Sequence, residues 1–262
     1  MKLLTLNCHS WQEENQMEKI KCLAETIQAE DYDVIALQEV SQLHRKQEEN
    51  GRVSEDNYVR VLLDELEKLE VYDYQAVWDL SHLAYEEKYE EGLALLTKHP
   101  IEQANSFFIS RSQDIHRWKT RKIVGAKIRI NEELISFYSC HLGWWHDEEE
   151  PFKHQVDNLL RQAKKDEPYF LMGDFNNNAF IEGEGYDYLS RQGVYDTYEL
   201  AEERDDGVTV SGAIAGWSKS QEDKRIDFIF ASKPVSVKRS SIIFNGANRP
   251  MISDHFGLEI EL

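Results

Sequence analysis

Cysteine and proline are scarce in this chain of 262 residues, and long apolar runs are missing. The three cysteines, Cys8, Cys22 and Cys140, are scattered and odd in number, which matches neither a disulfide framework nor the spacing of a zinc site. This usage indicates a reducing compartment. Neither a signal peptide nor a membrane span is recognisable in the sequence. We therefore expect a cytoplasmic protein that does not act at a membrane.

Positive charge is also scarce, since 30 Lys and Arg residues stand against 49 Asp and Glu residues and the formal net charge is −19. Proteins that hold long nucleic acid use Lys and Arg to displace counterions from the phosphates. The charge therefore disfavours a long nucleic-acid partner without excluding one, because basic residues can still cluster locally. Solubility is the alternative explanation of the charge. A small phosphorylated substrate needs only local positive charge.

No linker rich in proline, glycine or serine divides the chain, and no internal repeat is visible. We expect one domain over residues 1–262, large enough for a single core. Apolar spacing predicts helices over 17–29, 58–69 and 152–163. Strands are predicted over 2–6, 33–37, 74–78, 91–97, 101–109, 122–130, 134–140, 169–172, 225–230 and after 257. Connections are expected over 41–57, 82–90, 177–207 and 209–220, the last as a mobile loop over a site.

The segment over residues 169–176 is the centre of the functional prediction. An apolar run of strand type leads directly into Gly173-Asp174-Phe175-Asn176. Because side chains of an extended chain repeat every two residues, Asp174 and Asn176 can point the same way. A carboxylate can deprotonate water or hold a metal, and a neighbouring amide can donate to an oxygen that gains charge. A strand followed by an Asx turn is the alternative interpretation.

Chemically capable residues also stand at the ends of other predicted strands. Each of them alone can be a solvated strand end. Parallel strands joined by a helix bring their carboxyl ends to one edge of a sheet, where ligands bind in α/β folds. Asp227 is flanked by apolar residues, so we expect it to be buried with a partner. The full set is Asn7, Glu39, His141, Asp227, Asp254 and His255.

Two further features concern the substrate. The segment 117–122 holds Arg117, Lys119, Arg121 and Lys122, and in so acidic a chain it is the best phosphate-facing candidate, with an exposed hairpin rim as the alternative. Two tryptophans, Trp144 and Trp145, follow the strand-end His141 closely. They are either core residues or an aromatic wall that holds the apolar face of a sugar or a base.

Taken together and in order, three motifs resemble those of the endonuclease/exonuclease/phosphatase superfamily, which includes DNase I, abasic-site endonucleases and inositol polyphosphate 5-phosphatases. The motifs are Leu-Gln-Glu at 37–39, Gly-Asp-Phe-Asn at 173–176 and Ser-Asp-His at 253–255. The resemblance runs from Leu4 to His255. It implies a DNase I-like α/β fold, a four-layer sandwich in which two packed mixed β-sheets are flanked by helices. It also implies hydrolysis of a phosphoester with Mg²⁺, or Mn²⁺, as the cofactor.

The resemblance implies a role for each matching residue. Asn7, Glu39 and Asp254 would be the ligands of the Mg²⁺ ion, and their hard oxygen atoms suit that ion. Asp174 would position or deprotonate the attacking water. Asn176 would steady the phosphoryl oxygens.

The implied roles of the remaining residues concern proton transfer and the phosphate. His255, oriented by buried Asp227, would bond the scissile phosphate or transfer a proton. His141 matches the histidine of the DNase-like and sphingomyelinase-like branches, with Glu91 as its acidic partner. Arg121 would lie on the phosphate side of the substrate.

The opening Leu-Leu-Thr-Leu-Asn-Cys-His-Ser-Trp is similar to members that act as maltose 6'-phosphate phosphatases. We therefore expect a phosphomonoesterase for a sugar phosphate, with Trp78, Trp144, Trp145 and Trp217 as candidates for a stacking wall. The alternatives are a metal-dependent nuclease or another phosphodiesterase, including a sphingomyelinase-like enzyme. A non-catalytic binding module on the same fold is a more distant alternative. No obligate protein partner is evident from the sequence.

Overall fold

The core forms in layers because successive side chains of the first two strands point to opposite faces. The computed structural model describes residues 1–46, 50–163 and 168–262. On β1, Leu3 packs between two sheets, whereas Leu4 packs toward the helices. On β2, Val34 and Ile35 divide in the same way. Each strand therefore contributes to two apolar layers at once.

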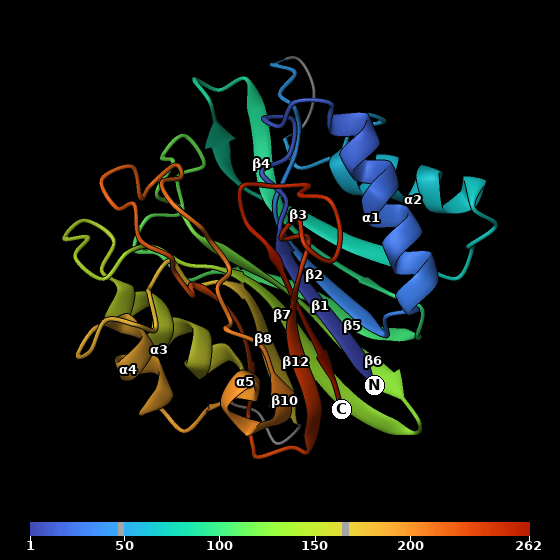
Figure 1. Cartoon of the computed structure of the whole chain (residues 1–262). Helices are drawn as coiled ribbons and strands as arrows, with labels where there is room; N and C mark the ends of the chain where they lie inside the picture. The colour runs from blue at the N-terminus through green and yellow to red at the C-terminus, as the bar shows by residue number, and fades with distance from the viewer. Residues whose placement is uncertain (47–49, 164–167) are drawn as a thin grey trace.

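Two mixed sheets lie face to face in the middle of the molecule (Figure 1). The first has the strand order β10-β12-β13-β1-β2-β4-β3. Its strands are β1 (Lys2–Asn7), β2 (Val34–Leu43), β3 (Gln75–Ala84), β4 (Tyr89–Thr97), β10 (Ala201–Arg204), β12 (Val237–Ile243) and β13 (Gly257–Glu261). The second has the order β5-β6-β7-β8-β11-β9. Its strands are β5 (Ile101–Phe108), β6 (Lys122–Ile130), β7 (Glu133–His141), β8 (Tyr169–Asp174), β9 (Tyr195–Asp196) and β11 (Asp227–Ala231).

Helices cover the outer faces of both sheets (Figure 1). On the seven-stranded sheet, α1 (Gln16–Glu30) and α2 (Tyr58–Lys68) bury an apolar stripe that includes Ile20 and Leu62. On the six-stranded sheet, α3 (Phe152–Ala163) and α4 (Gly185–Ser190) pack against residues of β7, β8 and β11. The short α5 (Thr197–Leu200) follows β9. The predicted four-layer α/β sandwich is confirmed.

The boundaries of two predicted connections are wrong. The segment 82–90 has strand residues at both ends and a turn only over 85–88, since β3 runs to Ala84 and β4 starts at Tyr89. Its polar residues occur in strands because side chains such as His82 lie over a buried, polar cavity. The segment 41–57 begins inside β2, which ends at Leu43, and residues 47–49 of that prediction lie outside the described residues.

The sequence prediction missed β12 and the short strands β9 and β10. The alternation on β12 is incomplete, because exposed Lys238 and Arg239 follow each other. The sequence of β12 therefore shows neither a regular alternation nor an unbroken apolar run from which a strand could be predicted. Among the described residues, no helix combines the length and the apolar character that a membrane crossing requires.

Candidate active site

The site is built where strand ends of both sheets meet. Asp174, at the end of β8, lies in register with His141 at the end of parallel β7 and with Asp227 at the start of antiparallel β11. Asn7, at the end of β1 in the other sheet, reaches the same group, and its Nδ2 donates to Oδ2 of Asp174 over 3.2 Å. The fold thus gathers residues that are up to 220 positions apart in sequence, from Asn7 to Asp227.

Glycine at position 173 allows β8 to approach β7. A Cβ atom on Gly173 would lie 1.9 Å from the backbone oxygen of Cys140, and the φ angle of +150° is one that L side chains rarely adopt. Directly after it, Oδ1 of Asp174 accepts a hydrogen bond of 2.8 Å from the backbone nitrogen of Asn176. This contact is an Asx turn. The two interpretations of this segment, an Asx turn and a functional carboxylate, are therefore compatible, because Asp174 forms the turn through Oδ1 and faces the site through Oδ2.

A bulge in β2 carries Glu39 toward the site. The register of β2 against β4 shifts between Leu37 and Val40, and Glu39 itself has a φ of 50°. Bulges redirect side chains in this way. Oε1 of Glu39 accepts a hydrogen bond of 2.9 Å from Nδ2 of Asn7. The amide of Asn7 therefore holds the carboxylates of Glu39 and Asp174 together.

Asp174 is a buried carboxyl group between two histidines. Its Oδ2 lies 3.6 Å from Nε2 of His141 and 3.8 Å from Nε2 of His255. Burial, followed by the charge of Asp227, raises the pKa of Asp174 above its ordinary value. Burial, followed by the charge of Arg121, lowers the pKa of His141, so this ring is neutral near pH 7. A carboxylate with a raised pKa is a stronger base toward water.

His255 is held by Asp227 behind it. Nδ1 of His255 lies 3.0 Å from Oδ2 of Asp227, and both side chains are buried. Burial opposes the charged ring, but the charge and the hydrogen bond of Asp227 outweigh it and raise the pKa of His255 to about 10. His255 is therefore a cation near neutral pH, with Nε2 toward Asp174. The expectation that Asp227 is buried with a partner agrees with this geometry.

These groups surround a cavity of about 270 Å³. Its wall combines carboxylates, histidines and aromatic rings. Of the residues predicted from sequence, those that line it are Glu39, Glu91, Arg121, His141, Trp144, Asp174, Asn176, Asp254 and His255. Asn7 and Asp227 stand behind this wall and bond to residues on it. The spatial convergence required by the sequence prediction is therefore present.

Of the basic residues in the segment 117–122, Arg121 lines the cavity. The other three form ion pairs with carboxylates: Arg117 with Glu149, Lys119 with Asp147 and Lys122 with Asp79. Arg121 is only 4% exposed and donates to the backbone oxygen of Trp118 over 3.0 Å. Within residues 1–46, 50–163 and 168–262, its Nε has no hydrogen-bond partner and no carboxylate lies within 4.0 Å of its guanidinium. A buried, unpaired cation therefore lines the cavity.

Glu39 and Asp254 are candidate ligands of a divalent cation. Both line the cavity, and their side chains are 20% and 23% exposed. In the described part of the chain, neither carboxylate is paired with Lys or Arg. Two such oxygen donors with access to a cavity fit a hard cation. Asn7 differs from the expectation, because its Oδ1 accepts from the backbone nitrogen of His9 over 3.1 Å and its NH₂ group faces the carboxylates. Its role as a metal ligand stays a prediction.

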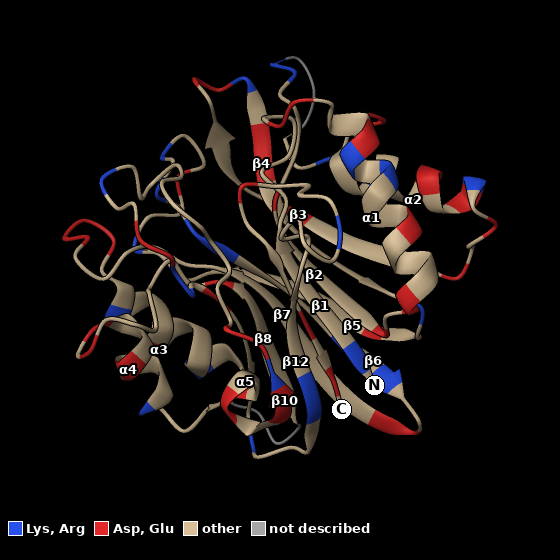
Figure 2. Ribbon diagram, viewed as in Figure 1, with Lys and Arg blue, Asp and Glu red and all other residues tan. Residues whose placement is uncertain are grey.

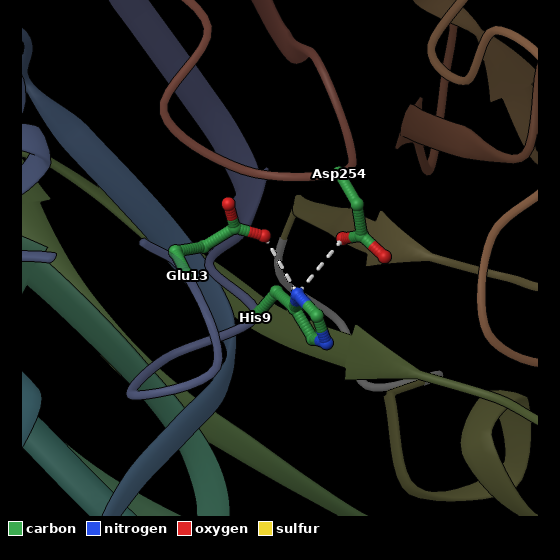
Figure 3. A group of neighbouring side chains, drawn as sticks. All are labelled: His9, Glu13 and Asp254. Carbon is green, nitrogen blue, oxygen red and sulfur yellow. Dashed lines mark hydrogen bonds and ion pairs between the residues drawn. The ribbon is translucent and has the colours of Figure 1, made fainter. Parts of the chain in front are cut away.

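His9 was not predicted from sequence and lies beside Asp254. Figure 3 shows Nδ1 of His9 facing the carboxylates of Glu13 and Asp254, at 2.7 Å and 3.7 Å. Glu13 also pairs with Lys19. Burial opposes the charged ring of His9, but the charge of Asp254 and the hydrogen bond of Glu13 raise its pKa. Nδ1 of His9 is thus hydrogen-bonded to Glu13, and its ring lies close enough to Asp254 to interact with that carboxylate through its charge.

Two predicted substrate-side contacts differ in the structure. Trp145 packs against Phe152 and Tyr188 beside the helices, so it belongs to the core rather than to the cavity. Its neighbour Trp144 lines the cavity. Consecutive residues point in different directions, which explains why one tryptophan reaches the cavity and the other does not. Glu91 lies 3.4 Å from His82 rather than beside His141, whose nearest carboxylates among the described residues are those of Asp174 and Glu39.

Sequence reasoning also missed His82, Tyr85 and Trp118 as cavity residues. His82 was assigned to a connection, yet it stands opposite Glu91 in the β3–β4 ladder. The predicted strand that begins at Glu91 offered a signal: extending it and the preceding strand toward each other would have included His82. Trp118 lies in the basic segment, 6.0 Å from Trp144 between ring centres.

The loop over residues 209–220 lies against the site, as expected from its position. Ala215 and Gly216 line the cavity, and Nε1 of Trp217 donates to Oδ1 of Asn176 over 3.1 Å. Nζ of buried Lys224 donates to the backbone oxygens of Gly212 and Glu222 and so closes the base of the loop. Its mobility stays a prediction. Trp78, by contrast, is part of the apolar core.

Comparison with known proteins agrees with this geometry. The chain matches the Endonuclease/Exonuclease/phosphatase family over residues 4–255. A solved family protein from Leptotrichia buccalis is 40% identical, with a TM-score of 0.92, and the match covers 100% of this chain and 99% of that one. A mannosyl-6-phosphatase from Bacteroides thetaiotaomicron is 18% identical, with a TM-score of 0.72 and coverage of 100% and 98%. Truncated TDP2 from Caenorhabditis elegans is 17% identical, with a TM-score of 0.65 and coverage of 99% and 95%. No curated protein matches the chain. The chain therefore belongs to the endonuclease/exonuclease/phosphatase family.

Proposed function

We propose that this protein is a metal-dependent phosphoester hydrolase that releases phosphate from a sugar phosphate such as maltose 6'-phosphate. The observation that carries the proposal is the buried, unpaired guanidinium of Arg121 in the same small cavity as Asp174 and His255. A buried charge without a partner is costly. A bound phosphate group would supply the missing partner, and arginine suits its planar, bidentate recognition.

The residues on the cavity wall supply the chemistry of in-line attack by water. Asp174 accepts a proton from the attacking water, since its pKa is raised by burial and by Asp227. Protonated His255 donates from Nε2 to a phosphoryl oxygen, and Arg121 stabilises the charge on the other side of the phosphate. Asn176 can donate to a phosphoryl oxygen only after it releases its present partner, because its Nδ2 donates to the backbone oxygen of Leu142.

A divalent cation fits beside these groups. Glu39 and Asp254 would hold it, and their hard oxygen donors favour Mg²⁺ or Mn²⁺. When bound, such an ion polarises the phosphoryl group and stabilises charge on the leaving oxygen. Asn7 orients the carboxylate of Glu39 from behind, and His9 lies beside Asp254 on the cavity wall.

Size and charge favour a small monoester over a polynucleotide. The cavity has about 270 Å³, which is near the lower end of small-molecule sites. Outside it, Lys and Arg are interspersed with Asp and Glu along the helices and loops (Figure 2). Three of the four basic residues in the segment 117–122 are already paired with carboxylates. A nuclease needs an extended basic surface instead.

Phosphate release from a panel of substrates tests the proposal. The panel contains maltose 6'-phosphate, glucose 6-phosphate, nucleoside monophosphates and an oligonucleotide, each with Mg²⁺ and with EDTA. We expect release from a sugar phosphate that stops with EDTA. Release from the oligonucleotide alone would instead make the protein a nuclease.

A further inference from the structure

Two adjacent carboxyl groups on β4 have opposite surroundings. Glu90 and Glu91 point to opposite faces of the strand. Glu90 is fully occupied inside the protein: it accepts from Nε2 of Gln42 at 2.8 Å and from the backbone nitrogen of Gly51 at 3.1 Å, and it lies 3.3 Å from Nδ1 of His44. This outer pair, His44–Glu90, needs no ligand.

The inner pair, His82–Glu91, is different. Glu91 is 7% exposed and lines the cavity, and its polar neighbour is Nε2 of His82 at 3.4 Å. Within the described part of the chain, the carboxyl group of Glu91 forms no hydrogen bond to backbone or side chain. A buried polar group without hydrogen bonds costs about 1–3 kcal/mol of stability. An unsatisfied carboxyl group facing a cavity is therefore ready to bond a ligand.

Burial also weakens the charged forms of both members of the inner pair. Burial, followed by the charge of Glu39, raises the pKa of Glu91, which favours the protonated acid. Burial, followed by the charge of Arg121, lowers the pKa of His82 to about 3, so the ring is neutral. A neutral imidazole and a carboxylic acid each offer one donor and at least one acceptor. Such a surface matches hydroxyl groups rather than phosphate.

Aromatic rings line the same cavity as the inner pair. The guanidinium carbon of Arg121 lies 5.8 Å from the ring centre of Trp144, and Trp118 stands 6.0 Å from the same ring. All three residues line the cavity together with His82 and Glu91. The cavity therefore combines the charged groups of Glu39, Asp174 and Arg121 with the His82–Glu91 pair and two aromatic rings.

We propose that His82 and Glu91 bind hydroxyl groups of the sugar that carries the phosphate, while Trp144 supports the apolar face of its ring. This inference rests on the proposed function and names the residues that select the substrate. The pair contacts the sugar and not the phosphorus, so it determines specificity and takes no part in bond cleavage.

Kinetics with paired substrates test this assignment. The probes are glucose 6-phosphate, maltose 6'-phosphate, deoxy analogues of glucose 6-phosphate and p-nitrophenyl phosphate, which lacks hydroxyl groups. His82→Gln should lower kcat/KM for the better sugar phosphate by about tenfold or more, because lost hydroxyl contacts leave buried polar groups unpaired. It should change kcat/KM for p-nitrophenyl phosphate by less than about threefold, since no hydroxyl contact is lost there. At least one deoxy analogue should lose activity with the wild type but not with the variant.

The outer pair supplies the matched control. His44→Gln removes a similarly buried histidine from the other His–Glu pair, whose glutamate also lies on β4. It should leave the ratio of activity on sugar phosphate to activity on p-nitrophenyl phosphate unchanged. Glu91→Gln repeats the test should His82→Gln fail to fold. Equal losses of activity on sugar phosphate and on p-nitrophenyl phosphate in both His82→Gln and Glu91→Gln would show that the pair has only a structural role. That result would refute this inference and leave the proposed function standing. Absence of release from every sugar phosphate by the wild type would refute the proposed function and this assignment with it.

Discussion

Nδ2 of Asn7, on the seven-stranded sheet, lies 3.2 Å from Oδ2 of Asp174, on the six-stranded sheet. The same nitrogen lies 2.9 Å from Oε1 of Glu39. One amide group thus joins the two sheets at the point where their strand ends meet, and it places two carboxylates side by side. The relative position of the two sheets and the geometry of the site depend on each other through this contact.

Replacement of Asn7 by alanine should affect activity more than stability. Asn7→Ala removes the donor that holds Glu39 and Asp174, so kcat/KM should fall by about 10- to 100-fold, while loss of the two hydrogen bonds should cost about 1–3 kcal/mol of unfolding free energy. Kinetics and urea unfolding measure the two effects. As the control, Asn57→Ala removes a buried asparagine that caps α2, and it should reduce stability by about 1 kcal/mol with normal kinetics. Normal activity in Asn7→Ala would contradict the role given to this contact.

Cation binding should depend on Glu39. Glu39→Gln removes one charged oxygen ligand, so the affinity for Mn²⁺ measured by titration calorimetry should fall by about tenfold or more without loss of the fold. Glu30→Gln changes a carboxylate that pairs with Lys2 and Arg249 outside the cavity, and it should leave the affinity unchanged. Equal affinities in the wild type and Glu39→Gln would place the cation elsewhere.

The His255–Asp227 pair should make stability depend on pH. The pKa of His255 is about 10 in the folded protein and about 6.5 when unperturbed, so the folded state holds the proton more tightly. The stabilisation is therefore complete below about pH 6.5 and is lost as the pH rises toward 10. In EDTA, the difference in unfolding free energy between the wild type and Asp227→Asn should shrink from pH 7 to pH 10. A difference that stays constant over this range would show that the pair does not hold a proton.

Gly173 should tolerate no side chain. In Gly173→Ala the new Cβ would meet the backbone oxygen of Cys140 at 1.9 Å, so either β7 or β8 has to shift. We expect a loss of about 3 kcal/mol or more in thermal or urea unfolding, together with loss of activity. Gly183→Ala is the control, because its φ is also positive, at +80°, but no atom lies within 4 Å of the added Cβ. It should cost only about 1 kcal/mol. Similar losses in both variants would mean that backbone strain alone, not the approach of β7, requires the glycine.

The sequence carried enough information for the layers and for most of the site. The short, mostly apolar segment over residues 2–6 and the helical spacing after residue 16 are local signals, and both gave the correct elements. Asp174 and His255 stood in motifs specific enough to indicate convergence. The pairing of Glu91 with His82 was beyond reach, because it depends on the register between β3 and β4, including a bulge. The division between Trp144 and Trp145 likewise depends on which way each side chain turns after β7.

The partners of the basic residues in segment 117–122 were also not predictable. The charge of Arg117 and that of Arg121 look alike in sequence. Their difference arises from tertiary contacts, since Arg117 meets Glu149 at the surface whereas Arg121 is buried beside Trp144. The same limit applies to His9, whose contact with Asp254 joins residues from opposite ends of the chain.

The most direct measurement of the central claim is phosphate release from maltose 6'-phosphate and related sugar phosphates by the wild type and by Asp174→Asn, in Mg²⁺ and in EDTA. The variant keeps the shape of the side chain and the turn after β8, so the fold should survive. We predict release by the wild type in Mg²⁺ only, and a loss of at least about 10³-fold in Asp174→Asn, because the base that accepts the proton of water is gone. Turnover that persists in EDTA, or an Asp174→Asn variant as active as the wild type, would contradict the account.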